Sequence, residues 1–166
     1  MNRKIINTII RNRKSIYPRD YSKEEIPDKT IKEILLNANH APTHRMTQPW
    51  FFKVYKNESK QKLIDIVSKI DESKLSKIKL IKFIQKVNDS DTIISIFLNR
   101  DKKERLPEWE EIAAVSMAVQ NMWLTCYVNN IGSYWSTPGF IDEYGKLIKL
   151  DNNESSTTSD NDGKFT

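Results

Sequence analysis

The segment PEWEEIAAVSMAVQNMWLTCYV, residues 107–128, is the most hydrophobic helical stretch of the chain and decides how the rest is arranged. Apolar side chains occur nearly all round the helical cylinder from Ile112 to Val128, which is typical of a helix buried in a core or against another subunit. Pro107 and the glutamates after it suit a first turn, because acidic groups oppose the partial positive charge there. A general acid or base role for these glutamates is the less favoured alternative. Asn130 and Gly132 predict where the helix stops.

Two strands are predicted on the N-terminal side of this helix. Thr92–Leu98 is nearly continuous in apolar, β-branched residues, which indicates a central strand buried on both faces. Trp50–Lys56 is the second strand. Between them, residues 57–68 and 74–86 are typical of lysine-rich helices, and residues 71–73 are predicted to cap the second one.

Composition limits the class of protein. The 166 residues are enough for one domain, or one domain with a tail, and carry a formal charge of +5. No apolar run is long enough to cross a bilayer and no secretion signal precedes Asn12, so we expect a soluble, cytoplasmic protein. A single cysteine, Cys126, excludes an internal disulfide framework, and its apolar neighbours indicate packing rather than reactivity.

The positive charge could favour an anionic partner, but its distribution argues against nucleic acid. Lysines spread through residues 53–86 among acidic residues, which is typical of a solvated surface. Residues 11–15, Arg-Asn-Arg-Lys-Ser, are the concentrated exception and could donate hydrogen bonds to a phosphate. They also follow a predicted helix whose isoleucines recur at helical spacing from Ile5 to Ile10, so complementing the helix dipole is the alternative.

The loop HAPTHRMTQPW, residues 40–50, gathers hydrogen-bonding side chains between a predicted helix, residues 28–39, and the first strand. Loops held by rigid elements commonly carry ligand sites, although a merely solvated turn is the alternative. A metal site is not expected, because His40 and His44 have no Cys, Asp or Glu at ligand spacing and Pro42 interrupts a helix between them. Further along, residues 132–139, GSYWSTPG, predict either a strand followed by a loop or a ligand contact.

In order and separation, these segments resemble the FMN-dependent nitroreductase family, most closely its minimal-nitroreductase branch. The resemblance covers about residues 3–148. Residues 13–15 look like the family's Arg-Arg-Ser element, and 40–50 look like its Ala-Pro-x-His to Gln-Pro-Trp signature. Residues 107–121 resemble the start and centre of its long helix, and 132–137 resemble its Gly-Gly-x-Trp-Arg-Ser/Thr turn.

The resemblance implies an α+β fold: a three-layer α/β/α sandwich with a central mixed, mostly antiparallel sheet and a long buried central helix. It also implies a homodimer with FMN at the interface. The implied activity is hydride transfer from NADH or NADPH through FMN to a small electrophilic acceptor such as a nitroaromatic or quinone. A flavin- or ligand-binding relative without turnover is the alternative, and a basic nucleic-acid-binding module is a more distant rival.

The resemblance also implies cofactor-binding residues. Arg13, Lys14 and Ser15 would contact the phosphate, ribityl or pyrimidine side of FMN, His40 would contact the flavin of its own subunit, and His44 would reach the flavin of the partner. The remaining expected contacts are Trp135, Ser136, Thr137, Gln48 and, less strongly, Arg45. No catalytic side chain is expected, because the flavin supplies the difficult chemistry.

This sequence departs from the family pattern at two places. Ser136 stands where relatives have a basic residue, and Lys14 and His40 stand where many have arginine. After Leu150 the family continues with a hydrophobic strand, whereas residues 151–166 here are polar. We therefore expect an FMN-binding domain at 1–150, a disordered or truncated tail at 151–166, and an exposed sheet edge that pairs with another chain or lowers stability.

Overall fold

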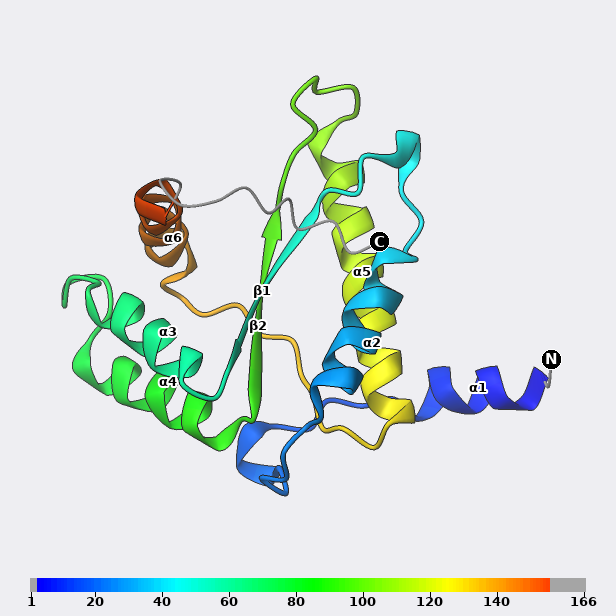
Figure 1. Cartoon of the computed structure of the whole chain (residues 1–166), viewed down its shortest axis with the longest axis horizontal. Helices are drawn as coiled ribbons and strands as arrows, with labels where there is room; N and C mark the ends of the chain where they lie inside the picture. The colour runs from blue at the N-terminus through cyan, green and yellow to red at the C-terminus, as the bar shows by residue number, and fades with distance from the viewer. Residues whose placement is uncertain (1–2, 156–166) are drawn as a thin grey trace.

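The computed structural model describes residues 3–155, with side chains to residue 148 (Figure 1). The helices lie in two layers, one on each face of a small sheet. In chain order the elements are α1 (Arg3–Asn12), η1 (Pro18–Asp20), α2 (Asp28–Asn39), η2 (His44–Met46), β1 (Trp50–Lys56), α3 (Ser59–Ser68), α4 (Lys77–Asp89), β2 (Thr92–Leu98), α5 (Glu108–Val128) and α6 (Ile141–Ser155), where η1 and η2 are short 3-10 turns.

β1 and β2 form an antiparallel pair in which Trp50 lies opposite Leu98 and Lys56 opposite Thr92. Both strands have the predicted bounds. The expectation that β2 is buried on both faces is wrong, since every residue of β2 is only half-buried. The physical reason is that, within the described residues, the sheet has two strands, so β2 has a neighbour along one edge only. Residues 132–137, for which a strand was one of the two readings, form a loop.

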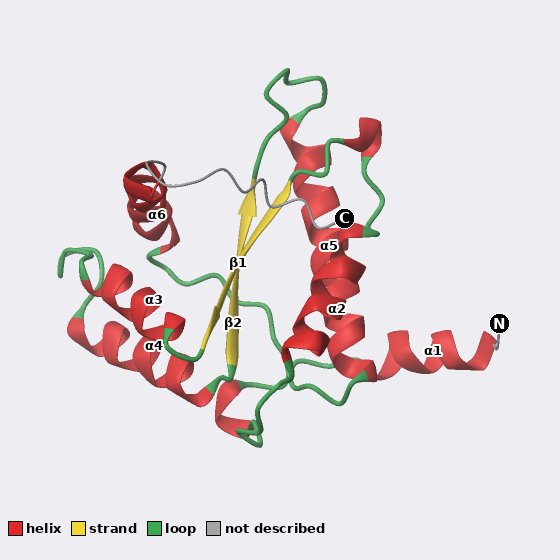
Figure 2. Cartoon of the chain, viewed as in Figure 1, coloured by secondary structure: helices red, strands yellow, loops and turns green. Residues whose placement is uncertain are grey.

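Figure 2 shows β1 and β2 between α2 and α5 on one side and α3, α4 and α6 on the other. Because side chains alternate along a strand, the two strands contribute to an apolar cluster on each face. Phe52, Val54, Ile94 and Ile96 pack against α2 and α5. On the other face, Tyr55, Ile93 and Phe97 pack with α3, α4 and α6. The expected α+β fold with helices on both faces of the sheet is therefore confirmed.

α5 is the central helix that residues 107–128 predicted. It begins directly after Pro107 and packs along α2, where Asn37 Nδ2 donates to Thr125 Oγ1 over 2.9 Å. Cys126 is buried in this contact region, and burial raises the pKa of its thiol, as expected of a packing cysteine. One side of α5 stays uncovered in the single chain: Ile112 is 50% exposed and Val128 56%.

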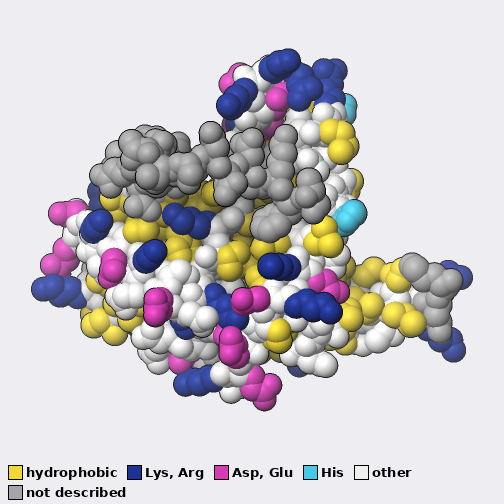
Figure 3. All heavy atoms as spheres, in the orientation of Figure 1, with side chains coloured by type: hydrophobic (Ala, Val, Ile, Leu, Met, Phe, Trp, Pro, Cys, Tyr) yellow, Lys and Arg dark blue, Asp and Glu magenta, His cyan; other side chains and the backbone are white. Residues whose placement is uncertain are grey.

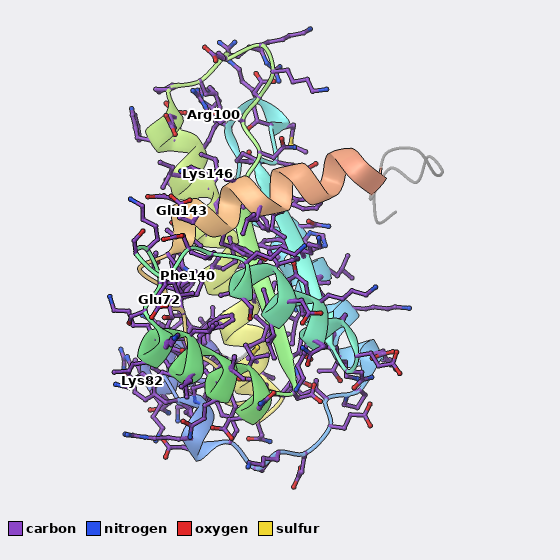
Figure 4. The ribbon with its side chains drawn as sticks, turned by 90° about the vertical axis from the view of Figure 1, so that its left-hand side faces the viewer. Glu72, Lys82, Arg100, Phe140, Glu143 and Lys146 are labelled. Carbon is purple, nitrogen blue, oxygen red and sulfur yellow. The ribbon has the colours of Figure 1, made fainter. Side chains whose placement is uncertain are left out.

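α4 and α6 form the opposite layer. α4 begins after Ser76, so the prediction that residues 71–73 cap it is wrong: Asp71 Oδ1 instead accepts the Ser73 N–H and closes a separate turn. Figure 4 shows Phe140 between α6 and α4, where its ring lies 5.2 Å from that of Phe83 in an edge-to-face contact. The Tyr144 hydroxyl then joins α6 to the sheet through Tyr55 Oη at 3.0 Å and Ser95 Oγ at 2.9 Å.

α1 projects from the body of the molecule (Figure 1), and its apolar stripe lies on the surface (Figure 3). Ile5 is 55% exposed and Ile10 54%, and no residue of α1 is buried. At the other end of the chain, α6 runs through residue 150, the expected domain boundary, to Ser155, and the rest of the expected tail lies outside the described residues. Within residues 3–155, none of the helices combines the length and apolar character that crossing a membrane needs.

Candidate functional site

The first candidate segment, Arg13 to Ser15, follows directly on α1. Lys14 and Ser15 are exposed, whereas Arg13 is half-buried and lies on the ring of Trp123, with Cζ 4.2 Å from the ring centroid. Its Nη1 atom is buried and has no hydrogen-bond partner. Among the described side chains, residues 3–148, no carboxylate forms an ion pair with Arg13. A buried cationic donor without a partner is unfavourable by itself and favourable toward an anion.

The second candidate segment, residues 132–137, lies beside the first. The Ser133 carbonyl oxygen accepts two hydrogen bonds, from the Ile16 N–H at 3.1 Å and from Trp123 Nε1 at 3.2 Å. The rings of Tyr17 and Tyr134 lie 5.3 Å apart in the same contact. Two segments about 120 residues apart in sequence thus meet at the C-terminal end of α5. The side chains of Trp135, Ser136 and Thr137 are exposed there.

Gly132 permits this close approach. A Cβ atom at Gly132 would lie 2.9 Å from the Tyr21 ring and 3.3 Å from Ile16 Cγ2, closer than side chains tolerate without rearrangement. Tyr21 is enclosed enough that burial, followed by the nearby Tyr134 hydroxyl, raises the pKa of its phenol well above the usual range. The phenol is therefore neutral, and its ring closes the space beside Gly132.

A cavity of about 1240 Å³ runs along the open edge of β2 and is lined by α4, α5 and residues 132–140. It includes Trp135, Ser136 and Thr137 but neither residues 13–15 nor the loop 40–48. Its volume exceeds that of a typical small-molecule site, which is roughly 300–1,000 Å³. The unpartnered Arg13 donor is therefore a more specific indicator of a ligand than the cavity.

The third candidate segment, residues 40–48, runs from the end of α2, which bonds to Asn121 and Thr125 through Asn37, to the first turn of α5. His40 is exposed directly after α2, and His44 opens η2. The Gln48 N–H donates to Thr43 Oγ1 at 3.2 Å, which closes the loop. Arg45, Met46 and Gln48 all have positive φ, between 43° and 54°, in the left-handed region that residues with a Cβ disfavour. Such backbone strain is often found at binding sites.

His44 is held by the first turn of α5, since its Nδ1 lies 2.8 Å from Glu110 Oε2. The neighbouring Glu111 is 1% exposed and accepts hydrogen bonds from the Asp101 N–H and from Arg100 Nε, each at 2.9 Å. These donors, the Asp101 N–H first, lower the pKa of Glu111. Figure 4 shows Arg100 beside the start of α5. Glu111 therefore anchors the loop that precedes α5, which agrees with the structural reading of these glutamates.

The predicted site residues thus form two groups in one chain. Arg13 contacts Trp123 and His44 contacts Glu110; thirteen residues of α5 separate these two anchors, a rise of about 20 Å. The structure brings residues 13–15 and 133–137 together and leaves His44 and Gln48 at the far end of the helix. Contact of the ten expected residues with a cofactor stays a prediction.

Sequence reasoning missed Trp123, Tyr21 and Gly132 as parts of this site. A tryptophan inside a long apolar helix is normally a core residue, and no local signal shows that an arginine 110 positions earlier lies on its ring. Gly132 was assigned to the end of the helix and to the segment 132–139, but not to a close approach of two backbone segments. A glycine directly before a segment of aromatic and hydroxyl residues can indicate that two backbone segments of one chain approach each other closely, and this was the available signal.

Comparison with known proteins finds related sequences and structures. Residues 10–157 match the model of the Nitroreductase family. The chain is 30% identical over 137 residues to the "Putative NAD(P)H nitroreductase YfhC" of Bacillus subtilis (strain 168), covering 80% of this chain and 69% of that protein.

Solved structures share the fold. A nitroreductase-like family protein from Bacillus cereus superposes with a TM-score of 0.73 at 24% identity, covering 87% of this chain and 75% of the other. A structure from Desulfovibrio desulfuricans, described as a "putative nitroreductase in complex with fmn", superposes with a TM-score of 0.67 at 24% identity, covering 92% of this chain and 77% of the other.

Proposed function

Since this chain belongs to the nitroreductase family, we propose that it is an FMN-dependent oxidoreductase that passes reducing equivalents from NAD(P)H to a small electrophilic acceptor such as a nitroaromatic or a quinone. The observation that carries the proposal is the buried, unpartnered Nη1 of Arg13 beside the hydroxyl-bearing segment 133–137. The name of the B. subtilis relative supports the nicotinamide donor, and the FMN complex from D. desulfuricans supports the flavin.

The residues present fit an FMN phosphate and ribityl chain. The guanidinium of Arg13 supplies a charge-assisted donor that no group of the described chain occupies, and Lys14 and Ser15 extend the donor set into solvent. Ser136 and Thr137 offer hydroxyls on the adjacent segment, suited to ribityl oxygens. When bound, FMN would supply the electron-carrying chemistry, and the chain's residues bind and orient it.

A complete site requires a second copy of the chain. His44 and Arg13 are anchored about 20 Å apart along α5, so one chain holds these two candidate contacts toward opposite ends of the helix. Two α5 helices packed antiparallel would place the His44 end of one protomer beside the Arg13 end of the other. Exposed apolar side chains on α5 and α1, such as Ile112 and Ile10, support a homodimer of this kind.

The test is purification with and without added FMN, followed by a visible spectrum and by anaerobic bleaching with NADH and with NADPH. We expect a yellow protein that bleaches with a nicotinamide and then oxidises it continuously when a nitroaromatic or quinone is added. Flavin binding without turnover would favour the non-catalytic relative. Folded protein that stays colourless in excess FMN would rule out the proposal.

A paired substitution tests the residues. Combined Arg13→Ala and Ser15→Ala removes a charge-assisted bond and a neutral one, together roughly 2–4 kcal/mol, and should raise the FMN Kd by roughly 30- to 1,000-fold. Arg19→Ala is the matched control, since the Arg19 side chain is 82% exposed and, within the described residues, forms its ion pair with the neighbouring Asp20 at 3.6 Å. Equal FMN retention by both variants would remove residues 13–15 from the site.

A further inference from the structure

Trp123 contacts both parts of the proposed phosphate site, one through the face of its indole and the other through the N–H on its edge. The ring plane carries the guanidinium of Arg13, whose Cζ lies 4.2 Å from the ring centroid. The indole N–H donates to the Ser133 carbonyl oxygen, which also accepts the Ile16 N–H. Trp123 is half-buried in α5, a rigid element, so the positions of both contacts are tied to the central helix.

Stacking on an indole suits an arginine that has to bind an anion. An arginine that stacks on an aromatic face keeps its N–H donors available, whereas an ion pair with a carboxylate would consume them. The buried and unpartnered Nη1 is consistent with this, because it shows a donor that the protein has desolvated without satisfying. A carboxylate at this place would compete with a phosphate; an aromatic ring does not.

The Ser133 carbonyl oxygen is the second group that Trp123 contacts. By accepting the Ile16 N–H, it joins the residue that follows segment 13–15 to segment 133–137. The Trp123 indole N–H donates to the same oxygen and so ties this junction to α5. Gly132 keeps the segment close, since a Cβ there would lie 2.9 Å from Tyr21. Without the indole N–H, the Ser133 carbonyl oxygen would lose one of these two hydrogen bonds and keep the one from the Ile16 N–H.

We propose that Trp123 is a positioning residue for the cofactor phosphate: it orients Arg13 by stacking and sets the distance between residues 13–15 and 133–137 through the Ser133 carbonyl. This inference rests on the proposed FMN function. It differs from a general packing role, because it acts through Arg13 and therefore concerns the phosphate and not the isoalloxazine ring.

Two flavins separate these roles. FMN carries the phosphate and riboflavin lacks it, so the Kd of each is measured by flavin fluorescence titration of the purified protein. Trp123→Leu should raise the FMN Kd by about 10-fold, the size of a desolvated cation–π contact, and should change the riboflavin Kd by less than about 2-fold. Trp123→Phe keeps a ring under Arg13 but loses the N–H, so its FMN Kd should lie between those of wild type and Trp123→Leu.

A double-mutant cycle with Arg13→Ala completes the test. In the Arg13→Ala background, Trp123→Leu should change the FMN Kd by less than about 2-fold, because the group it positions is already gone. Arg19→Ala, on an exposed arginine that lies 6.0 Å over the Tyr17 ring, should leave both Kd values unchanged. Urea denaturation of each variant without flavin verifies the fold, and Trp123→Phe carries the comparison if Trp123→Leu does not fold.

The outcomes distinguish this inference from the proposed function. The inference is wrong, and Trp123 is a packing residue, if wild type binds FMN but Trp123→Leu raises the Kd values for FMN and riboflavin equally. The same holds if its effect on the FMN Kd is as large in the Arg13→Ala background as in wild type. If folded wild type binds neither flavin, the proposed function fails and the inference fails with it.

Discussion

Glu111 allows a quantitative test of how the loop before α5 is held against the first turn of that helix. Its carboxylate is 1% exposed and accepts hydrogen bonds from the Asp101 N–H and Arg100 Nε, both at 2.9 Å. Glu111→Gln keeps the shape and removes the charge. Two charge-assisted bonds of roughly 1.5–3 kcal/mol each are weakened and one acceptor is retained, so the free energy of unfolding should fall by about 3 kcal/mol. For a chain of this size, the Tm should fall by roughly 6–12 °C by circular dichroism.

The pH dependence follows from the lowered pKa of Glu111. A carboxyl whose pKa is lower in the folded than in the unfolded state stabilises the protein above its unfolded pKa, and this stabilisation is lost as the pH falls through the folded pKa. The difference between wild type and Glu111→Gln should therefore be complete at neutral pH and should shrink below about pH 4, near the unfolded pKa of a glutamate.

Glu110→Gln is the matched control, because Glu110 stands next in the same turn but pairs with His44, whose side chain is 59% exposed. Such a pair contributes about 0–1 kcal/mol. The reasoning would be refuted if the two variants lost equal stability, or if the Glu111→Gln difference were the same at pH 7 and pH 3.

Two further perturbations test the packing around the candidate site and the opposite layer. Gly132→Ala forces a methyl group to 2.9 Å from the Tyr21 ring and should lower the free energy of unfolding by about 1–3 kcal/mol. Gly145→Ala, inside α6 with open space around it, should raise that free energy by about 0.5–1 kcal/mol. Urea titration measures both changes, and changes of the same sign would contradict the close contact at Gly132. Tyr144→Phe removes the hydroxyl that meets Tyr55 and Ser95 and should cost about 1–3 kcal/mol, measured as a lower Tm; an unchanged Tm would mean that apolar contacts alone dock α6.

The elements that local pattern specifies were predicted well. β1, β2 and α2 have the predicted bounds, and α5 begins directly after Pro107, because twofold and 3.6-fold periodicity and proline at a helix start act within a few residues. The start of α4 was mispredicted for a related reason. Asp71 and Ser76 are both suitable cap residues, and local sequence does not decide which of them ends the preceding turn.

The candidate site was predictable in parts. The basic, loop and hydroxyl segments were identified from their donor-rich composition and their order along the chain. Their pairing was not, since Arg13 lies on Trp123 and Ile16 bonds to Ser133 only after α5 has placed the second residue of each pair. The same holds for His44, which the fold places at the opposite end of α5 beside Glu110.

The amino-acid sequence by itself determined the bounds of β1, β2 and α2, the short segments rich in polar side chains, and the order of motifs by which the chain resembles its family, because periodicity and motifs carry local information; the layered fold was expected from that resemblance. The tertiary structure alone decided that Arg13 keeps a buried donor without a partner, that Trp123 joins two distant segments, and that one chain separates the two halves of the site. These properties depend on distances between residues more than 60 positions apart, which are set by how α5 packs against the sheet and not by any stretch of sequence read alone.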